Sequence, residues 1–166
     1  MTTIDATMFA ALPYGMRDSL ISPRKVANKV QLDPSAFLAD PELIQALEKR
    51  ATPVSCGEDR VLFRRGDPPM GIFILRTGEA AISMISDSDT IDLSCHATAG
   101  SLLGLPGVIA DQPYSLTAIA RKGANVSFVS KDEFNDLMQS EQSLMVKILQ
   151  VLAAEVRSAR LAITQG

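Results

Sequence analysis

The sequence predicts a mainly β protein with flanking helices, in which the strands form a sandwich or a barrel. Two observations support this. Between residues 52 and 130, short apolar runs such as RVLFRR, GIFILR and AAISMIS alternate with turn residues, a pattern typical of antiparallel strands. Beyond residue 130, the apolar residues recur at helical spacing instead. We therefore expect one domain over residues 34–166, with its strands in the first part and helices at its end.

The N-terminal part of the chain divides into an arm and a helical segment. We expect residues 1–33 to form an arm, because prolines and a glycine interrupt its short apolar pieces. Residues 34–50 are expected to be helical. Two aspartates in this region each precede a proline, namely Asp33-Pro34 and Asp40-Pro41. Aspartate is a preferred N-cap and proline suits the first helical position, so both pairs indicate helix starts.

Turn residues divide residues 52–130 into strands. Gly66-Asp67-Pro68-Pro69 cannot lie in a central strand, because neither proline has the N–H that a sheet ladder requires. Gly78 lies between two apolar runs and is expected to adopt the positive φ that a tight turn needs.

A clear helix start follows the strands. Ser130 and Glu133 have the S-x-x-E spacing of a capping box, with Val129 and Phe134 placed as a hydrophobic staple. We therefore expect residues 131–166 to form the C-terminal helices.

The C-terminal segment has two apolar edges. Leu144, Ile148 and Val151 form one edge, which is expected to pack on the strands. The second edge has heptad spacing and consists of Met145, Leu149, Leu152, Val156, Ala159 and Ile163. The spacing predicts that Leu149, Leu152, Val156, Ala159 and Ile163 pair with a second copy of the chain. The alternative is that both edges wrap around their own domain.

Composition excludes several classes of protein. Sixteen Lys plus Arg and nineteen Asp plus Glu give a net charge of −3, without the basic band that nucleic acid binding requires. The only histidine is His96, and the two cysteines, Cys56 and Cys95, are far apart in sequence. We therefore expect no metal site and no enzyme activity. A haem would have to use His96 or a cysteine as its axial ligand. Without a signal peptide or a membrane span, a cytoplasmic location is expected.

Four stretches of the sequence together resemble the cyclic-nucleotide-binding domain of the Crp/Fnr regulators. They are LFRRGDPPMGIFILRTGEAAISM, AGSLLGLPG, SLTAIA and VSFVSKDEF, and the resemblance covers residues 36–166. It implies a jelly roll preceded by a short helix and followed by a long helix at which two subunits pair. In the family, that helix leads into a DNA-binding helix-turn-helix. This chain ends at Gly166, so we expect it not to bind DNA directly.

The resemblance also implies a phosphate-binding cassette at residues 100–117. Family members that bind cyclic nucleotides have Gly-Glu near its start, and Arg-Ser or Arg-Thr near its end. The acid accepts a hydrogen bond from the ribose hydroxyl, and the arginine forms an ion pair with the phosphate. Here Gly104 is followed by Leu105, and the arginine place falls on Tyr114 or Ser115. The hydroxyls of Ser115 and Thr117 are retained on the strand that follows.

The two missing charges define the functional prediction. Each hydrogen bond to a charged group contributes roughly 1.5–3 kcal/mol, so their loss weakens binding by about two to four powers of ten. We therefore expect a homodimeric regulatory module, with no cofactor, that binds cyclic nucleotide weakly or not at all and senses another small molecule. One alternative is the sensor half of a transcription regulator that still binds cyclic AMP or cyclic GMP. Another is a protein-interaction module with no ligand.

Overall fold

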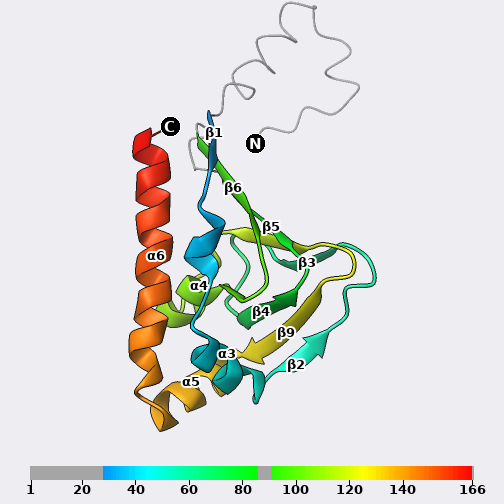
Figure 1. The fold of residues 1–166 in the computed structure, drawn as a ribbon, viewed down its shortest axis with the longest axis vertical. Helices are drawn as coiled ribbons and strands as arrows, with labels where there is room; N and C mark the ends of the chain where they lie inside the picture. Colours follow the sequence, from blue (N-terminus) through cyan, green and yellow to red (C-terminus); the bar gives the residue numbers. More distant parts are fainter. Residues whose placement is uncertain (1–27, 86–90, 166) are drawn as a thin grey trace, which may run out of the picture.

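The fold is a β-sandwich with helices along one side (Figure 1). The computed structural model describes residues 28–85 and 91–165. One sheet has the strand order β1-β6-β5-β8-β3, and the other has the order β2-β9-β4-β7. The strands are β1 (Asn28–Gln31), β2 (Thr52–Val54), β3 (Arg60–Phe63), β4 (Gly71–Thr77), β5 (Ala80–Ile85), β6 (Ile91–Ala97), β7 (Ser101–Leu103), β8 (Thr117–Ala120) and β9 (Asn125–Ser130). The predicted mainly β architecture and its jelly-roll form are confirmed.

The first described strand was not expected from the sequence. Residues 28–31 fall in the predicted arm, but they form β1 and pair in parallel with β6, where Val30 lies opposite Leu93. The sequence NKVQ contains a single apolar residue, so it has no alternating pattern from which a strand could be predicted. Residues 1–27 of the predicted arm lie outside the described residues.

The segment after β1 contains two short helices. The 3-10 helix η1 (Pro34–Phe37) and the helix α3 (Pro41–Glu48) begin at the expected aspartate caps. Each carboxylate accepts a backbone N–H two residues later, from Ser35 at 3.0 Å and from Glu42 at 2.8 Å. The helical segment predicted for residues 34–50 is therefore present, but it is interrupted between the two helices.

The turn at Gly78 has the expected geometry, whereas one strand was not anticipated. Gly78 has a φ of 86°, and a Cβ at this position would lie 2.8 Å from the Cα of Ala124. Glycine is therefore required there for two separate reasons. The unexpected strand is β7, three residues within the predicted cassette that pair with β4.

Alternate side chains of β4 pack into two different cores. Phe73 and Leu75 lie in the core between the two sheets. Ile72 and Ile74 point the other way, into a second core that the helices cover. A central strand buried on both faces reads as a continuous apolar run, which explains the sequence GIFILR.

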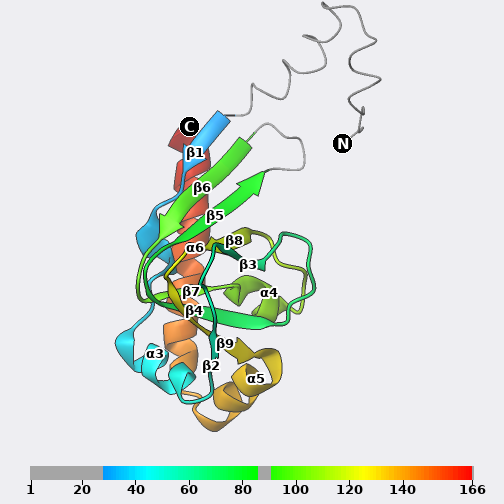
Figure 2. The same ribbon diagram turned by 90° about the vertical axis from the view of Figure 1, so that its right-hand side faces the viewer.

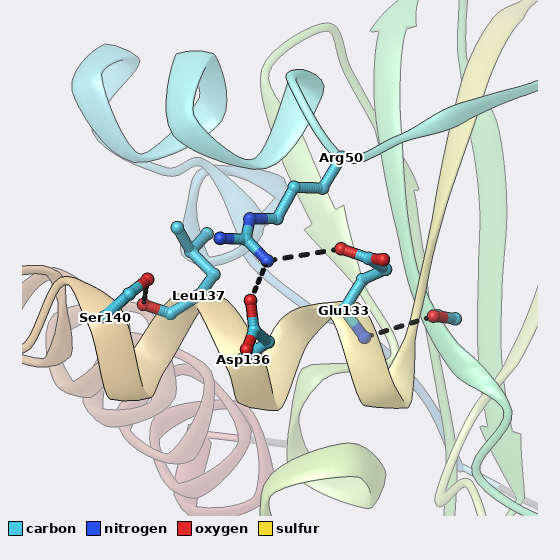
Figure 3. A network of polar contacts seen from close by, with 6 residues as sticks. Arg50, Glu133, Asp136, Leu137 and Ser140 are labelled. Carbon is cyan, nitrogen blue, oxygen red and sulfur yellow. Dashed lines mark hydrogen bonds and ion pairs between the residues drawn. The ribbon is translucent and has the colours of Figure 1, made fainter.

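Helix α5 (Lys131–Ser140) begins at the predicted capping box. The Oγ of Ser130 accepts the N–H of Glu133 at 3.2 Å. Val129 and Phe134, the predicted staple pair, are both buried. Figure 3 shows that Arg50, which follows α3, reaches both Glu133, at 3.2 Å, and Asp136 on α5. These contacts join the two helices at one end of the sandwich.

The long helix α6 (Leu144–Gln165) runs along the whole sandwich, past η1 and α4 (Figures 1 and 2). Leu144, Ile148 and Val151 are each at most 3% exposed, so the first predicted apolar edge packs on its own domain. The Oγ of Ser158 accepts the backbone N–H of Asp33 at 3.0 Å, which fixes the middle of the helix to the start of η1.

Candidate ligand cavity

The predicted cassette folds as a short helix between two strands. Helix α4 (Leu105–Ala110) starts at Gly104, which has a φ of 89°, and ends at Asp111, which has a φ of 53°. A Cβ on Gly104 would lie 2.9 Å from the ring of Tyr114. The glycine is therefore needed both for the backbone turn and for the close approach of Tyr114.

Leu105 stands where the family pattern has its acid, and it is a core residue. Its side chain is 0% exposed and belongs to the core that the helices cover. Val108, one turn further along α4, lies in the same core. The side chain at the acid position therefore stabilises the cassette by packing and is not presented to a ligand.

Tyr114 is directed into the sandwich. It is 3% exposed, and its ring stacks on Phe63 with the centroids 4.1 Å apart. Its hydroxyl donates to the carbonyl of Gly71 at 2.6 Å and accepts the N–H groups of Met70 and Gly71, both at 3.1 Å. Burial raises the pKa of this hydroxyl, so it stays protonated and can donate. Tyr114 therefore holds the cassette against β4.

Ser115 and Thr117 point to different surroundings. The Oγ1 of Thr117 accepts the backbone N–H of Arg65 at 3.0 Å, so this hydroxyl joins β8 to the turn after β3. Ser115 lines a cavity between the cassette and α6. Of the two positions proposed for the family's arginine, only Ser115 faces this cavity.

The cavity has a volume of about 240 Å³ and lies between the sandwich, the cassette and α6. Its walls are mainly apolar and come from three directions. They include Leu32, Phe37, Met84 and Leu93 from the strands and η1, Pro106, Ser115 and Leu116 from the cassette, and Leu152, Glu155, Val156 and Ala159 from α6. Three residues of the predicted pairing edge, Leu152, Val156 and Ala159, thus also form part of this wall.

Glu155 is the one ionisable residue in the cavity wall, within the part of the chain that the structure describes. Its Oε1 is enclosed and has no hydrogen-bond partner among the described residues. Burial raises the pKa of Glu155 to about 8. Arg76 and Arg121 do not line the cavity; Arg76 pairs with Glu48 and Arg121 pairs with Asp59, both at 3.3 Å. The cavity wall therefore contains an acid, Glu155 on α6, whereas the family pattern has an arginine in the cassette.

Glu155 was not predicted as a site residue, although its spacing in the sequence contained a signal. Glu155 follows Leu152 by three residues and precedes Ala159 by four, so it lies on the same face of the helix. A carboxylate within an apolar helical face is unusual and indicates a site.

The second predicted edge of α6 is largely exposed. Leu149 is 57% exposed and Val156 is 52% exposed, and with Ala153 they line a groove along the helix. Leu152 and Ala159 are half-buried. Ile163 belongs to α6, but its side chain lies outside the described part of the chain. Leu152 and Ala159 also pack against the cores of their own domain, so the exposed part of this edge is at Leu149 and Val156.

The other candidate ligands lie apart from the cavity. His96 is exposed on β6 and its Nδ1 lies 3.7 Å from Glu79. Cys95 is buried, and chiefly through this burial its pKa is raised to about 11. Neighbouring residues of a strand point to opposite faces, so these two side chains do not serve one site. Among the described residues, no group of three His, Cys, Asp or Glu side chains could hold a metal ion. None of the described helices is long and apolar enough to cross a membrane.

A jelly roll, a cassette helix and a long C-terminal helix over a shared cavity define the class of cyclic-nucleotide-binding-like sensor domains. A family model described as the cyclic nucleotide-binding domain matches residues 53–141. The chain belongs to this family.

Individual relatives agree with this assignment. The transcriptional activator protein Anr of Pseudomonas aeruginosa is 24% identical over 123 residues, which are 74% of this chain and 49% of the relative. The chain thus spans about half the length of the curated relatives it matches. The catabolite activator protein of Thermus thermophilus has the same fold, with a TM-score of 0.64 and 14% identity over 80% of this chain and 62% of that one. The c-di-GMP-responsive regulator CLP of Xanthomonas campestris also has this fold, with a TM-score of 0.60 and 18% identity. The match covers 76% of this chain and 62% of that one.

Proposed function

We propose that this chain is the sensor domain of a homodimeric regulator, and that its cassette binds cyclic nucleotide weakly or not at all. The observation that carries the proposal is the cavity between the cassette and α6, whose wall contains Glu155 and, among the described residues, no lysine or arginine. The domain acts in the cytoplasm, catalyses no reaction and does not itself contact DNA. It senses a different small molecule through this cavity.

The electrostatics of the cavity support this proposal. A cyclic nucleotide carries a phosphate charge, which needs fixed donors or a cation when it leaves water. Neither residue at the family's charged positions supplies one, because Leu105 is buried in the core and Ser115 offers only a hydroxyl. Helix α4 is a single short element, so its backbone N–H groups alone replace little of the lost binding energy.

Calorimetry tests the proposal directly. We expect cyclic AMP and cyclic GMP to bind with dissociation constants well above about 10 μM, since tighter binding requires about 7 kcal/mol. Cyclic di-GMP is included because the CLP relative responds to it, and its two phosphates lead to the same expectation. Binding of any of the three below about 10 μM would contradict the proposal.

The exposed edge of α6 supports the homodimer. Seven large hydrophobic side chains are exposed among the described residues, and four of them lie on this helix: Val146, Leu149, Val156 and Leu161. Contiguous exposed apolar surface of this kind marks an interaction site. The spacing of Leu149 and Val156 is one heptad, which suits pairing with the same edge of a second copy.

Sedimentation of two double variants tests the pairing. Leu149→Glu with Val156→Glu places two charges on the exposed edge, and we expect a dimer to become a monomer without loss of the fold. The matched control is Gln45→Glu with Gln139→Glu, which adds the same charge at exposed positions of α3 and α5 and should remain dimeric. If the first variant still sediments as a dimer, α6 does not pair the subunits.

We further propose that the domain belongs to a transcription regulator. The support is the similarity to the activator Anr, of which the chain matches about half. A reporter assay in the source cell, with the whole gene carrying Leu149→Glu, which does not line the cavity, should then lose regulation of its target promoters. An unchanged transcriptome in that variant would argue instead for a protein-interaction role.

A further inference from the structure

We propose that the cavity between the cassette and α6 binds a small, mainly apolar molecule that carries one protonated amino group, and that Glu155 receives this group. The inference rests on the proposed function, because it names the ligand of the same sensor site. It reverses the charge relation of the family pattern, in which a base on the protein receives an anion on the ligand.

The walls of the cavity select an apolar body. Besides Glu155, the lining side chains are apolar except for the hydroxyls of Ser115 and Ser158. Sites for small ligands are typically apolar with a few placed polar groups that fix orientation. The volume of about 240 Å³ is below the range of roughly 300–1,000 Å³ for drug-sized ligands, so it suits a molecule with a single ring or a short chain.

The carboxylate of Glu155 selects the polar group. Its enclosed Oε1 lacks a hydrogen-bond donor among the described residues, and a buried acceptor without a partner is costly enough to require an explanation. A donor on the ligand would satisfy this oxygen. An ammonium group would also neutralise the charge of the carboxylate, which is why we choose an amine and not an alcohol.

Among the described residues, no other charged side chain lines the cavity. Asp33 and Arg157 line a neighbouring cavity on the other side of Ser158. Lys29 on β1 lies opposite Asp92 on β6, and the next pair along the two strands is Val30 and Leu93, which face inward. Because successive side chains of a strand point to opposite faces, Lys29 and Asp92 lie on the outer face of that sheet. Towards the other end of α6, Lys147 forms ion pairs with Asp40 at 3.0 Å and with Glu42 at 3.6 Å.

Binding of an amine has a proton signature. Burial alone raises the pKa of Glu155 to about 8, so at pH 7 the carboxyl group in the empty cavity is mainly protonated. A protonated amine favours the ionised carboxylate, and the carboxyl proton is then released to the buffer. Amine binding should therefore release close to one proton at pH 7, and should tighten as the pH rises towards about 8.

Three probes of nearly equal size distinguish the contribution of the ligand's charge to binding from that of its apolar part. They are 2-phenylethylamine as the cation, 2-phenylethanol as the neutral molecule and 3-phenylpropionate as the anion. By calorimetry or ligand-observed NMR, we expect the amine to bind with a dissociation constant of about 1 mM or below. The anion should bind at least about tenfold more weakly than the amine.

One substitution and a matched control assign the effect to Glu155. Glu155→Gln keeps the shape of the side chain and should weaken binding of the amine about tenfold or more, abolish the proton release, and change binding of the alcohol by less than about twofold. Glu58→Gln removes the same charge at an exposed position and should behave as wild type. Thermal unfolding of both variants checks the fold, and Ser115→Phe should block all three probes at the mouth of the cavity.

The outcomes of this experiment separate the inference from the proposed function. The inference is overturned if 2-phenylethylamine fails to bind at about 10 mM, if the anion binds as well as the amine, or if Glu155→Gln leaves amine binding unchanged. Tight binding of cyclic AMP or cyclic GMP would overturn the proposed function instead. If cyclic nucleotides bind weakly and the three probes bind equally well, the proposed sensor function stands. Only the inference that the ligand carries an amino group is then wrong.

Discussion

The two sides of the cassette differ in how well they are packed. On the side that faces the sandwich and its helices, Leu105, Val108 and Tyr114 are each at most 3% exposed. On the side that faces α6, Pro106, Ser115 and Leu116 border a cavity of about 240 Å³. The two sides are a few residues apart in sequence and belong to the same loop and helix.

This difference shows that the family's two charged positions have separate structural consequences here. At the position of the acid, the side chain of Leu105 is buried in the core that the helices cover. Of the two candidate positions for the arginine, Ser115 is a small hydroxyl side chain at the border of the cavity that Glu155 also lines. Packing therefore stabilises the cassette from one side, while the other side borders a cavity.

The largest expected effect comes from returning the acid to its family position. Leu105→Glu places an ionisable group in a fully buried apolar site, so we expect the free energy of unfolding to fall by about 4 kcal/mol, or the protein not to fold. Ile109→Glu, on the 41% exposed side of the same helix, should cost less than about 1 kcal/mol. Urea unfolding measures both. Equal costs would mean that the two sides of the cassette are not packed differently.

The second effect concerns the hydroxyl of Tyr114. Tyr114→Phe keeps the stacking on Phe63 but removes three buried hydrogen bonds with Met70 and Gly71. We expect a loss of about 2 kcal/mol, because the backbone groups of β4 are left without this partner. Tyr114→Leu should cost more, since it also removes the ring. If Tyr114→Phe is as stable as wild type in urea, the hydroxyl does not hold the cassette.

The third effect is a pH dependence on the side that faces α6. The pKa of Glu155 is raised to about 8 in the fold, so the folded protein binds one more proton than the unfolded chain between about pH 4.5 and 8. Stability should therefore fall as the pH rises through this window, by on the order of 1 kcal/mol after screening is allowed for. Thermal unfolding of wild type and Glu155→Gln measures the difference, which should be largest above pH 8. Parallel curves would show that Glu155 is solvated.

The smallest effect is expected at Ser115, one of the two candidate positions for the family's arginine. Ser115→Arg adds a long side chain at an exposed position beside the cavity, so stability should change by less than about 0.5 kcal/mol. A loss of more than about 2 kcal/mol would mean that the α6 side of the cassette is as closely packed as the other. The same variant, titrated with cyclic AMP, shows whether one arginine restores binding.

The elements with local signals were predictable from the sequence. Ser130 and Glu133 form the expected cap, and Gly78 has the expected positive φ, because capping and tight turns depend on neighbouring residues. Strand β1 could not be predicted in this way. Its pairing with β6 depends on tertiary contacts, and its four residues carry no alternating pattern.

The candidate site was predictable in position but not in detail. The family pattern places the cassette at residues 100–117, where the structure has α4. It does not decide between Tyr114 and Ser115, because adjacent residues differ in direction according to the backbone that carries them. The structure turns Tyr114 into the sandwich and Ser115 towards α6. The surroundings of Glu155 depend on how α6 lies against the sandwich, which helical periodicity alone does not give.

The parallel pairing of β1 with β6 has a consequence for the order in which the molecule folds. Asn28 lies opposite Ile91, so this pair must close a long loop before its hydrogen bonds form, and such closure is slow and entropically costly. Strand β6 also pairs with β5, close to it in the chain, and can form without β1. We therefore expect β1 to dock last and its amide protons to exchange with solvent sooner than those of β4. Leu32 and Phe37, which follow β1, line the cavity, so a ligand bound there would slow that exchange.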